Sequence, residues 1–245
     1  MGVRRAVDLV LKQAPSVDKK VFTLGPLIHN DQTLELLQSR GVGILKEDQT
    51  SIPPAYIVTR AHGIPPQTYA ELCRCGHTLI DGTCPKVKTV HKIIEKYRNQ
   101  GFDIVIAGDE GHAEVIGLLG YAGNHVHLVH SVHQVHQLPQ LQKACLVSQT
   151  TFDSAQFDEI AAALQKKYPQ LVVKKTICSA TEIRQRETRD LAKQVDAMIV
   201  VGGKNSANTV RLAAIAREHA PIVQHVETEA EIDWNNIKGC KTLGI

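Results

Sequence analysis

Short runs of apolar, mostly β-branched residues recur along the chain, and longer amphipathic stretches separate most of them. Runs of this length predict buried strands, while apolar residues three or four positions apart predict helices. The expected strands lie at residues 21–23, 56–58, 78–81, 103–107, 125–129, 144–147, 171–174, 197–201 and 222–225. Strands that alternate with helices indicate an α/β fold with mainly parallel sheets.

The helical pattern is clearest at residues 85–100, 154–168 and 181–195. The expected strands could form one doubly wound sheet or several small sandwiches. A local similarity favours the sandwiches, because DGTCP (81–85) and TICSA (176–180) both place a cysteine between a strand and a helix. The first residues, GVRRAVD (2–8), begin a helix with no strand before it, so they resemble a third such unit that lacks its beginning.

The composition is that of an ordinary soluble chain. It has 245 residues, 28 Lys and Arg against 25 Asp and Glu, a net charge of +3 and 43% hydrophobic residues. This length allows one large domain or roughly two to three small ones. The basic residues are scattered, so nucleic acid is not an expected partner. No apolar run reaches the roughly 20 residues of a membrane span, and the start lacks the order of a signal peptide, which predicts a cytoplasmic protein.

Six cysteines raise the question of which ones do chemistry. In a reducing compartment they are expected to be thiols or metal ligands rather than disulfides. Cys84 and Cys178 stand just before helices, where backbone N–H groups and the helix dipole favour the metal-binding thiolate. One such cysteine is usually a packing residue, but two in matching contexts favour ligands. The others are expected not to be ligands: Cys73, Cys75, Cys145 and Cys240.

Three histidines, His29, His62 and His112, share one loop design, with an expected strand end before them and glycine nearby. A single histidine of this kind is more often a core or surface residue. Three in similar loops predict a set that converges on an anion, since α/β folds bind ligands at strand ends. The histidines within residues 125–136 resemble a metal tract but lack carboxylate or cysteine partners, so we expect a solvated strand and loop.

HAE (112–114) matches half of a zinc deaminase motif. The other half, P-C-x-x-C, does not follow it, so that interpretation fails. Glu114 then has two open interpretations. It is an acid that neighbouring anion-binding groups keep protonated and that delivers a proton, or it is a helix N-terminal residue stabilised by the dipole.

GGKNSAN (202–208) follows a strong expected strand and opens a helix. Glycines, hydroxyl and amide donors and N–H groups at a helix start are typical of a phosphate cradle. This is not a Walker loop, because the first glycine is missing and Asn205 follows the lysine. QTT (149–151) supplies further hydroxyls after another strand, although either loop alone could be an ordinary cap. Together the candidates predict a pocket for an oxygen-rich anion beside a metal centre with an open position.

Eight stretches, in order along essentially the whole chain, resemble the 4-hydroxy-3-methylbut-2-enyl diphosphate reductases, the LytB/IspH family. So many ordered matches are more specific than any single motif. The stretches are GVRRAV (2–7), LGPLIHN (24–30), RAHGIPP (60–66), DGTCPKV (81–87), HAEVIG (112–117), QTT (149–151), TICSAT (176–181) and GKNSAN (203–208).

The resemblance implies a three-lobed trefoil of small α/β/α sandwich domains around a central [4Fe–4S] cluster, with one cysteine from each lobe. The lobes would cover residues 1–84, 85–176 and 177–245. Cys84 and Cys178 would be cluster ligands, and Glu114 would supply protons. The substrate-binding residues would be His29, His62, His112, Thr150, Thr151, Ser206, Ala207 and Asn208.

The implied reaction is the reductive dehydroxylation of (E)-4-hydroxy-3-methylbut-2-enyl diphosphate. Its products are isopentenyl and dimethylallyl diphosphate, at the last step of the methylerythritol phosphate pathway of isoprenoid biosynthesis. Ferredoxin or flavodoxin would deliver the electrons. The cluster would supply the redox chemistry, and the protein would supply position, charge and protons.

The sequence departs from the family pattern in three places. Members usually read Phe-Cys-x-Gly-Val-Arg-Arg-Ala-Val, which puts Met1 at the x and the first cluster cysteine before it. Members also continue beyond Ile245 into a serine-bearing segment, and some carry a serine where this chain has Ala207. We therefore expect a fragment, or a mis-started reading frame, that is poorly active alone and lacks the third ligand.

Two alternatives remain at this stage. One is a degenerate, cluster-free paralogue that binds a diphosphate without catalysis, but it would need neither thiolates nor a proton donor. The other is a nucleotide-binding α/β enzyme, which would need a G-x-G-x-x-G or Walker sequence that this chain lacks.

Overall fold

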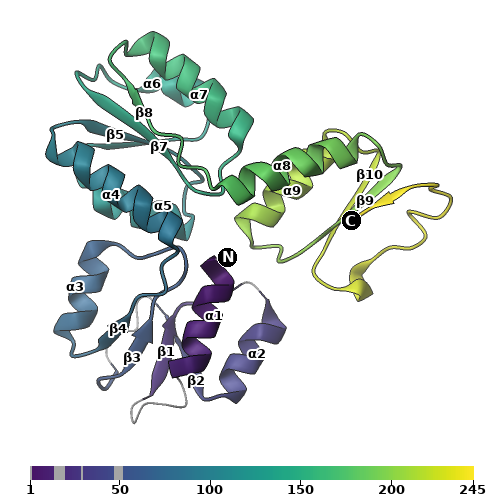
Figure 1. Ribbon diagram of the computed structural model, residues 1–245, viewed down its shortest axis with the longest axis horizontal. Helices are drawn as coiled ribbons and strands as arrows, with labels where there is room; N and C mark the ends of the chain where they lie inside the picture. Colours follow the sequence, from purple (N-terminus) through teal and green to yellow (C-terminus); the bar gives the residue numbers. More distant parts are fainter. Residues whose placement is uncertain (1, 14–19, 29, 47–51) are drawn as a thin grey trace. The chain divides into compact units, whose positions relative to one another are not determined.

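The computed structural model describes residues 2–13, 20–28, 30–46 and 52–245. Within them, eleven strands form three parallel sheets flanked by helices (Figure 1). The predicted α/β fold with several small sheets is confirmed, and a single doubly wound sheet is wrong. Among the described helices, none has the length and apolarity that crossing a bilayer requires.

The chain divides into two compact units. The larger unit comprises Met1–Gln149 and Glu159–Thr176, and the smaller unit comprises Thr150–Asp158 and Ile177–Ile245. The larger unit contains two of the sheets and the smaller unit contains the third. The lobe boundaries expected after residues 84 and 176 stay a prediction.

The first sheet, in the larger unit, has the strand order β2-β1-β3-β4. Ile57 of β3 faces a cluster that includes Leu72 of α3, while Val58 faces one that includes Ala6 and Val10 of α1. Alternate residues of a strand point to opposite faces, so helices cover both faces of this sheet. Its elements are α1 (Gly2–Gln13), β1 (Val21–Leu24), α2 (Asp31–Ser39), β2 (Val42–Leu45), β3 (Tyr56–Val58), α3 (Pro66–Arg74) and β4 (Thr78–Ile80).

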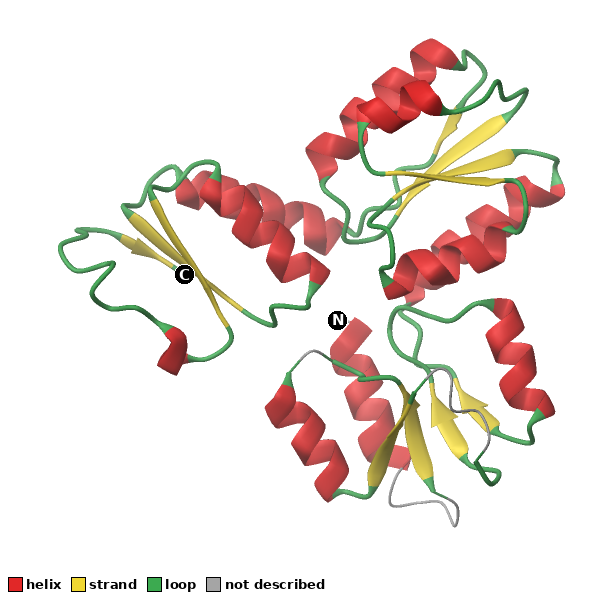
Figure 2. Ribbon diagram, turned by 180° about the vertical axis from the view of Figure 1, so that it is seen from behind, coloured by secondary structure: helices red, strands yellow, loops and turns green. Residues whose placement is uncertain are grey.

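The second sheet, also in the larger unit, has the order β6-β5-β7-β8. Ile104 and Ile106 of β5 pack with α4 and α5, and α6 and α7 lie over the opposite face (Figure 2). Burial on both faces explains why β5 and β7 read as continuous apolar runs. The elements are α4 (Pro85–Asn99), β5 (Asp103–Ala107), α5 (Ala113–Ala122), β6 (Val126–Val129), α6 (Val132–Gln137), β7 (Ala144–Ser148), α7 (Ser154–Lys167) and β8 (Val172–Val173).

The third sheet has the order β10-β9-β11, and α8 and α9 lie together on one of its faces (Figures 1 and 2). Met198 and Val200 of β9 pack with Ala192 of α8 and with Ala213 and Ala216 of α9. The elements are α8 (Ser179–Ala192), β9 (Ala197–Val201), α9 (Ala207–Arg217), β10 (Ile222–Val226), the 3-10 turn η2 (Glu229–Glu231) and β11 (Leu243–Gly244).

All nine expected strands occur, with ends that differ by at most two residues. Two strands, β2 and β11, were not expected, and the expected helix 181–195 starts and ends earlier, at Ser179 and Ala192. The prediction of a loop around His133 and His136 is wrong, because both residues lie on the short helix α6. His125 does lie on an exposed edge, where its Nδ1 is 3.5 Å from Asp103 Oδ1.

Candidate active site

Cys84 is the residue that caps the N-terminus of α4, as the sequence predicts. Its backbone N–H donates to Ala61 O at 2.9 Å, and its thiol is half-buried. The first residue of α1 lies directly against it, since a Cβ on Gly2 would come within 2.9 Å of the sulfur. Arg5 of the same helix donates to Thr83 O at 3.0 Å. The starts of two helices therefore meet at this thiol, and helix starts stabilise negative charge.

Cys178 holds the equivalent position in the smaller unit, at the N-terminus of α8. Its backbone N–H donates to Thr150 O at 2.9 Å, and Thr181 N–H donates back to Cys178 O at 2.7 Å. This thiol is also half-buried. The hydroxyl-bearing loop that contains Thr150 and Thr151 is thus bonded through its backbone to the second candidate ligand.

His62, His112 and Glu114 come together in the larger unit. The two imidazole rings meet edge to face, with centroids 5.2 Å apart. His112 caps the N-terminus of α5, where its Nδ1 accepts a hydrogen bond from Glu114 N–H at 3.2 Å. Because Nδ1 accepts, the proton of the neutral ring sits on Nε2. Glu114 is only 2% exposed, as a shielded acid would be, and it also lies in the first turn of α5, where the helix dipole stabilises a carboxylate, so both interpretations stay open.

The side chain of Gln149 holds the loop that carries His112 through a hydrogen bond that the sequence analysis did not predict. Gln149 is fully buried, and its Oε1 accepts a hydrogen bond from Asp109 N–H at 2.9 Å. Its own N–H donates to Ala107 O at 2.9 Å. His130, for which no role was expected, places Nδ1 3.3 Å from Asp109 Oδ1. The only signal in the sequence was an amide residue that directly follows a buried strand.

Ser206, Ala207 and Asn208 lie where α9 begins in the smaller unit. Ser206 is its N-cap, and its hydroxyl accepts from Thr209 N–H. Ala207 and Asn208 occupy the first turn, where helix N–H groups have no partner within the helix. All three residues are partly exposed. Free N–H groups and small polar side chains therefore lie together at the start of α9, an arrangement that can bind an anion.

The candidates therefore form two sets, one in each unit. Cys84, His62, His112 and Glu114 belong to the larger unit, while the smaller unit carries Thr150, Thr151, Cys178, Ser206, Ala207 and Asn208. That the two sets meet at one pocket stays a prediction. His29 and Met1 lie outside the described residues. No group of three or more His, Cys, Asp or Glu side chains that could hold a metal is present in the described part of the chain.

The four other cysteines lie in positions of a different kind. Cys73 and Cys75 are exposed at the end of α3. Cys145 is buried in β7, where desolvation raises the pKa of its thiol to about 12. Cys240 is half-buried in a loop before β11. None of them is at a helix start, in contrast to Cys84 and Cys178.

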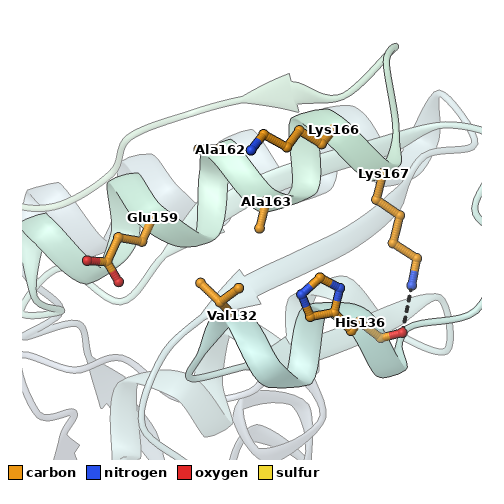
Figure 3. A pocket seen from close by; sticks show the side chains of 7 residues that line it. All are labelled: Val132, His136, Glu159, Ala162, Ala163, Lys166 and Lys167. Atoms are coloured by element: carbon orange, nitrogen blue, oxygen red, sulfur yellow. Dashed lines mark hydrogen bonds between the residues drawn. The ribbon is translucent and has the colours of Figure 1, made fainter.

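Two recesses of the larger unit differ in how close their lining residues are to the candidate site residues. A small one of about 60 Å³ is lined by residues that flank the two histidines, Gly63 and Ala113 among them. A groove of about 620 Å³ between α6 and α7 is lined by no candidate (Figure 3). In that groove, the Lys167 ammonium donates to three carbonyl groups at the end of α6, those of Val135, His136 and Leu138. Its charge serves as a helix cap.

Comparison with known proteins supplies the context for these two sets. The model of the LytB protein family matches residues 1–245. The 4-hydroxy-3-methylbut-2-enyl diphosphate reductases of Alkaliphilus oremlandii and Caldanaerobacter subterraneus are each 38% identical, over 100% of this chain and 88% and 86% of their own lengths. A solved structure of the E-1-hydroxy-2-methyl-but-2-enyl-4-diphosphate reductase from Plasmodium falciparum superposes with a TM-score of 0.93 at 28% identity, covering 99% of this chain and 78% of that one.

A second solved structure, of an (E)-4-hydroxy-3-methyl-but-2-enyl diphosphate reductase described as the terminal enzyme of the non-mevalonate pathway, is 35% identical with a TM-score of 0.73. The match covers 100% of this chain and 88% of that one. Since the family model spans all 245 residues and the relatives align along the full chain, this protein belongs to the LytB family.

Proposed function

We propose that this chain acts as a 4-hydroxy-3-methylbut-2-enyl diphosphate reductase. The substrate takes up two electrons and two protons, its allylic C–O bond breaks, and isopentenyl or dimethylallyl diphosphate and water are formed. One observation carries the proposal. Within a chain that matches the family over its whole length, two thiols stand at helix starts and a shielded acid lies beside two histidines.

Enzymes of this family use a [4Fe–4S] cluster, and we propose Cys84 and Cys178 as two of its ligands. Thiolates are the donors that iron–sulfur clusters require. Both sulfurs are half-buried at helix starts, and the absence of a side chain on Gly2 lets the start of α1 lie against Cys84 without a Cβ touching its sulfur. Bound there, the cluster would supply the two electrons.

Glu114 is proposed as the proton source. Its carboxyl is shielded from water, and its position is fixed because its own N–H donates to His112. A shielded carboxyl next to an anionic substrate holds a proton more readily than one in water. The Nε2–H of His112 and the ring of His62 are proposed to donate hydrogen bonds to the same substrate, and His29 is proposed as a third such group.

The diphosphate is proposed to bind the smaller unit's set. Thr150, Thr151 and Ser206 bring hydroxyl groups, Asn208 brings an amide, and Ala207 brings a backbone N–H in the first turn of α9. Such donors bind a phosphate without a counter-charge because the helix start is itself electropositive. Ferredoxin or flavodoxin is proposed as the electron donor.

Anaerobic reconstitution with iron and sulfide tests this function. We expect the chain to gain the brown absorption of an iron–sulfur cluster and to consume the substrate when a chemical reductant is present. Cys84→Ser and Cys178→Ser should each lose iron and activity. Cys73→Ser, which changes an exposed thiol at the end of α3, is the matched control and should keep both.

Two outcomes would count against the proposal. If the chain binds the substrate but takes up no iron, a cluster-free diphosphate-binding protein is the better explanation. If it neither binds nor reduces the substrate, the function is wrong.

A further inference from the structure

The loop between β9 and α9 is held by β10 and by the residues that follow that strand. Gly202 N–H donates to Val226 O at 2.9 Å, and His225 Nε2 lies 2.9 Å from Gly202 O. Gly202 has a φ of +151°, and a Cβ there would come within 2.8 Å of Thr209 Oγ1. The beginning of the loop is therefore fixed to the sheet and packed against α9.

Lys204, in the middle of this loop, is bonded at both its backbone and its side chain. Its N–H donates to Glu227 Oε1 at 2.6 Å, and its ammonium group pairs with the Glu231 carboxylate. Lys204 thus bonds to both Glu227 and Glu231. We call this set the Lys204 clamp.

The clamp changes the role expected for Lys204, the lysine of GGKNSAN (202–208). A lysine in a glycine-rich loop at a helix start normally places its ammonium group on a phosphate. Here a carboxylate already holds that group, and their hydrogen bond raises the pKa of Lys204 and lowers the pKa of Glu231. The polar groups left to face an anion are uncharged: the Ser206 hydroxyl, the Asn208 amide and the first N–H groups of α9.

We propose that Glu227 and Glu231 are positioning residues for the diphosphate site, which hold the loop through Lys204 so that only neutral donors contact the diphosphate. This inference rests on the proposed function, because it takes Ser206 and Asn208 as diphosphate ligands. An exposed ion pair contributes little to stability by itself. The effect on binding comes from fixing the loop, since preorganised donors bind an anion without an ordering cost.

Substitutions in the clamp should separate binding from turnover. In the reconstituted chain, we expect Glu227→Ala to raise KM about tenfold, the loss that one charge-assisted hydrogen bond allows, with kcat changed less than about twofold. Glu227→Gln keeps an acceptor oxygen and should restore most of the affinity. Lys204→Met and Glu231→Gln should each raise KM about threefold, and the double variant should do no more, because the two groups act as a pair. Glu229→Gln is the matched control, since Glu229 lies in the same turn but makes no hydrogen bond to the loop.

Hydrogen exchange gives a measurement that does not need activity. Amides in a peptide covering residues 202–208 should exchange faster in Glu227→Ala than in the parent chain or in Glu229→Gln. Unchanged exchange and unchanged KM in the clamp variants would overturn the inference. The inference would also be overturned if Lys204→Met lowered substrate affinity about a hundredfold while Glu231→Gln bound the substrate more tightly. Lys204 would then be a phosphate ligand.

Titration calorimetry with inorganic diphosphate distinguishes failure of the clamp from failure of the proposed function. A parent chain that binds neither diphosphate nor substrate overturns the function and, with it, the assignment of the clamp to that site. A parent chain that binds diphosphate with the same affinity as Glu227→Ala overturns the clamp alone. Weaker diphosphate binding in Glu227→Ala and parent-like binding in Glu229→Gln support it.

Discussion

In the larger unit Glu114 is 2% exposed, and its loop is fixed by the fully buried Gln149. In the smaller unit, Ser206 lies on a loop that is held by the exposed carboxylates of Glu227 and Glu231. The two sets of candidates are thus supported by opposite means, one by buried neutral contacts and the other by surface charge. Shielding from water favours the protonated form of a carboxyl that is to deliver a proton, whereas donors for an anion can remain near the surface.

This contrast has energetic consequences. Loss of a buried contact leaves a polar group without a partner and costs the full desolvation of that group. Loss of an exposed contact lets water take its place. We therefore expect changes in the larger unit's set to have the larger effects.

The largest effect is expected for Glu114→Gln. The amide keeps the size and hydrogen-bonding shape of the side chain but has no acidic proton to deliver. We expect kcat to fall by roughly 10²–10⁴, the usual contribution of a general acid, with little change in KM or in bound iron. Steady-state kinetics with a chemical reductant measure this. Glu110→Gln changes an exposed carboxylate of the same loop and serves as the control, and a kcat within tenfold of the parent chain would refute the role of Glu114.

The next effect concerns stability in acid. His91 of α4 is 5% exposed and stacks on Tyr121 of α5, with ring centroids 3.9 Å apart. Desolvation lowers the pKa of His91 to about 4. Below its ordinary pKa of 6.5 the unfolded chain takes up a proton that the folded chain does not. Stability should therefore fall as the pH drops from 6.5 towards 4, by up to about 3 kcal/mol, with no further loss from this group below that.

Denaturant unfolding at several pH values measures whether the free energy of unfolding falls as the pH drops. His91→Phe keeps an aromatic ring against Tyr121 but cannot titrate, so its free energy of unfolding should depend less on pH over the same interval. His125→Phe, at an exposed histidine of the same unit, should behave as the parent chain does. Parallel curves for the parent chain and His91→Phe would show that His91 is not the source.

A third effect compares two glutamines that each accept a hydrogen bond from a backbone N–H in the larger unit. Gln149 is fully buried and bonds to Asp109, whereas Gln134 is exposed and bonds to His130. Gln149→Ala removes a fully buried acceptor of the part-buried Asp109 N–H and should cost about 2 kcal/mol of unfolding free energy as well as lowering kcat through the His112 loop. Gln134→Ala should cost less than about 0.5 kcal/mol. Equal losses would mean that burial does not separate the two contacts.

Much of this organisation could be predicted from local sequence. The positions of Cys84 and Cys178 at helix starts can be predicted, because the helix starts follow from nearby residues such as Pro85. Elements with weak local signals were missed. The strand β2 contains a glycine, β11 is only two residues long, and α6 has the sequence VHQVHQ, in which polar residues outnumber apolar ones.

Contacts between distant parts of the chain could not be predicted in the same way. Gln149 and Asp109 are 40 residues apart, and Lys204 and Glu231 are 27 residues apart. Their pairing is decided by how parallel strands are ordered in each sheet, which no local window contains. For the same reason the sequence marked Lys204 as part of a phosphate cradle but not the carboxylate that holds its ammonium group.

The smallest effect is expected at two serines that both stand at a helix N-cap. Ser206 accepts a hydrogen bond from Thr209 N–H, but the side chain of Ser131 makes no such bond to α6. Ser206→Ala should therefore cost about 0.5–1 kcal/mol of unfolding free energy, while Ser131→Ala should cost almost nothing. Only Ser206→Ala should also weaken binding of inorganic diphosphate, because its hydroxyl is a proposed ligand. If both variants lose stability equally and neither affects binding, the start of α9 is an ordinary cap, and the contrast between the two units would lose its functional meaning.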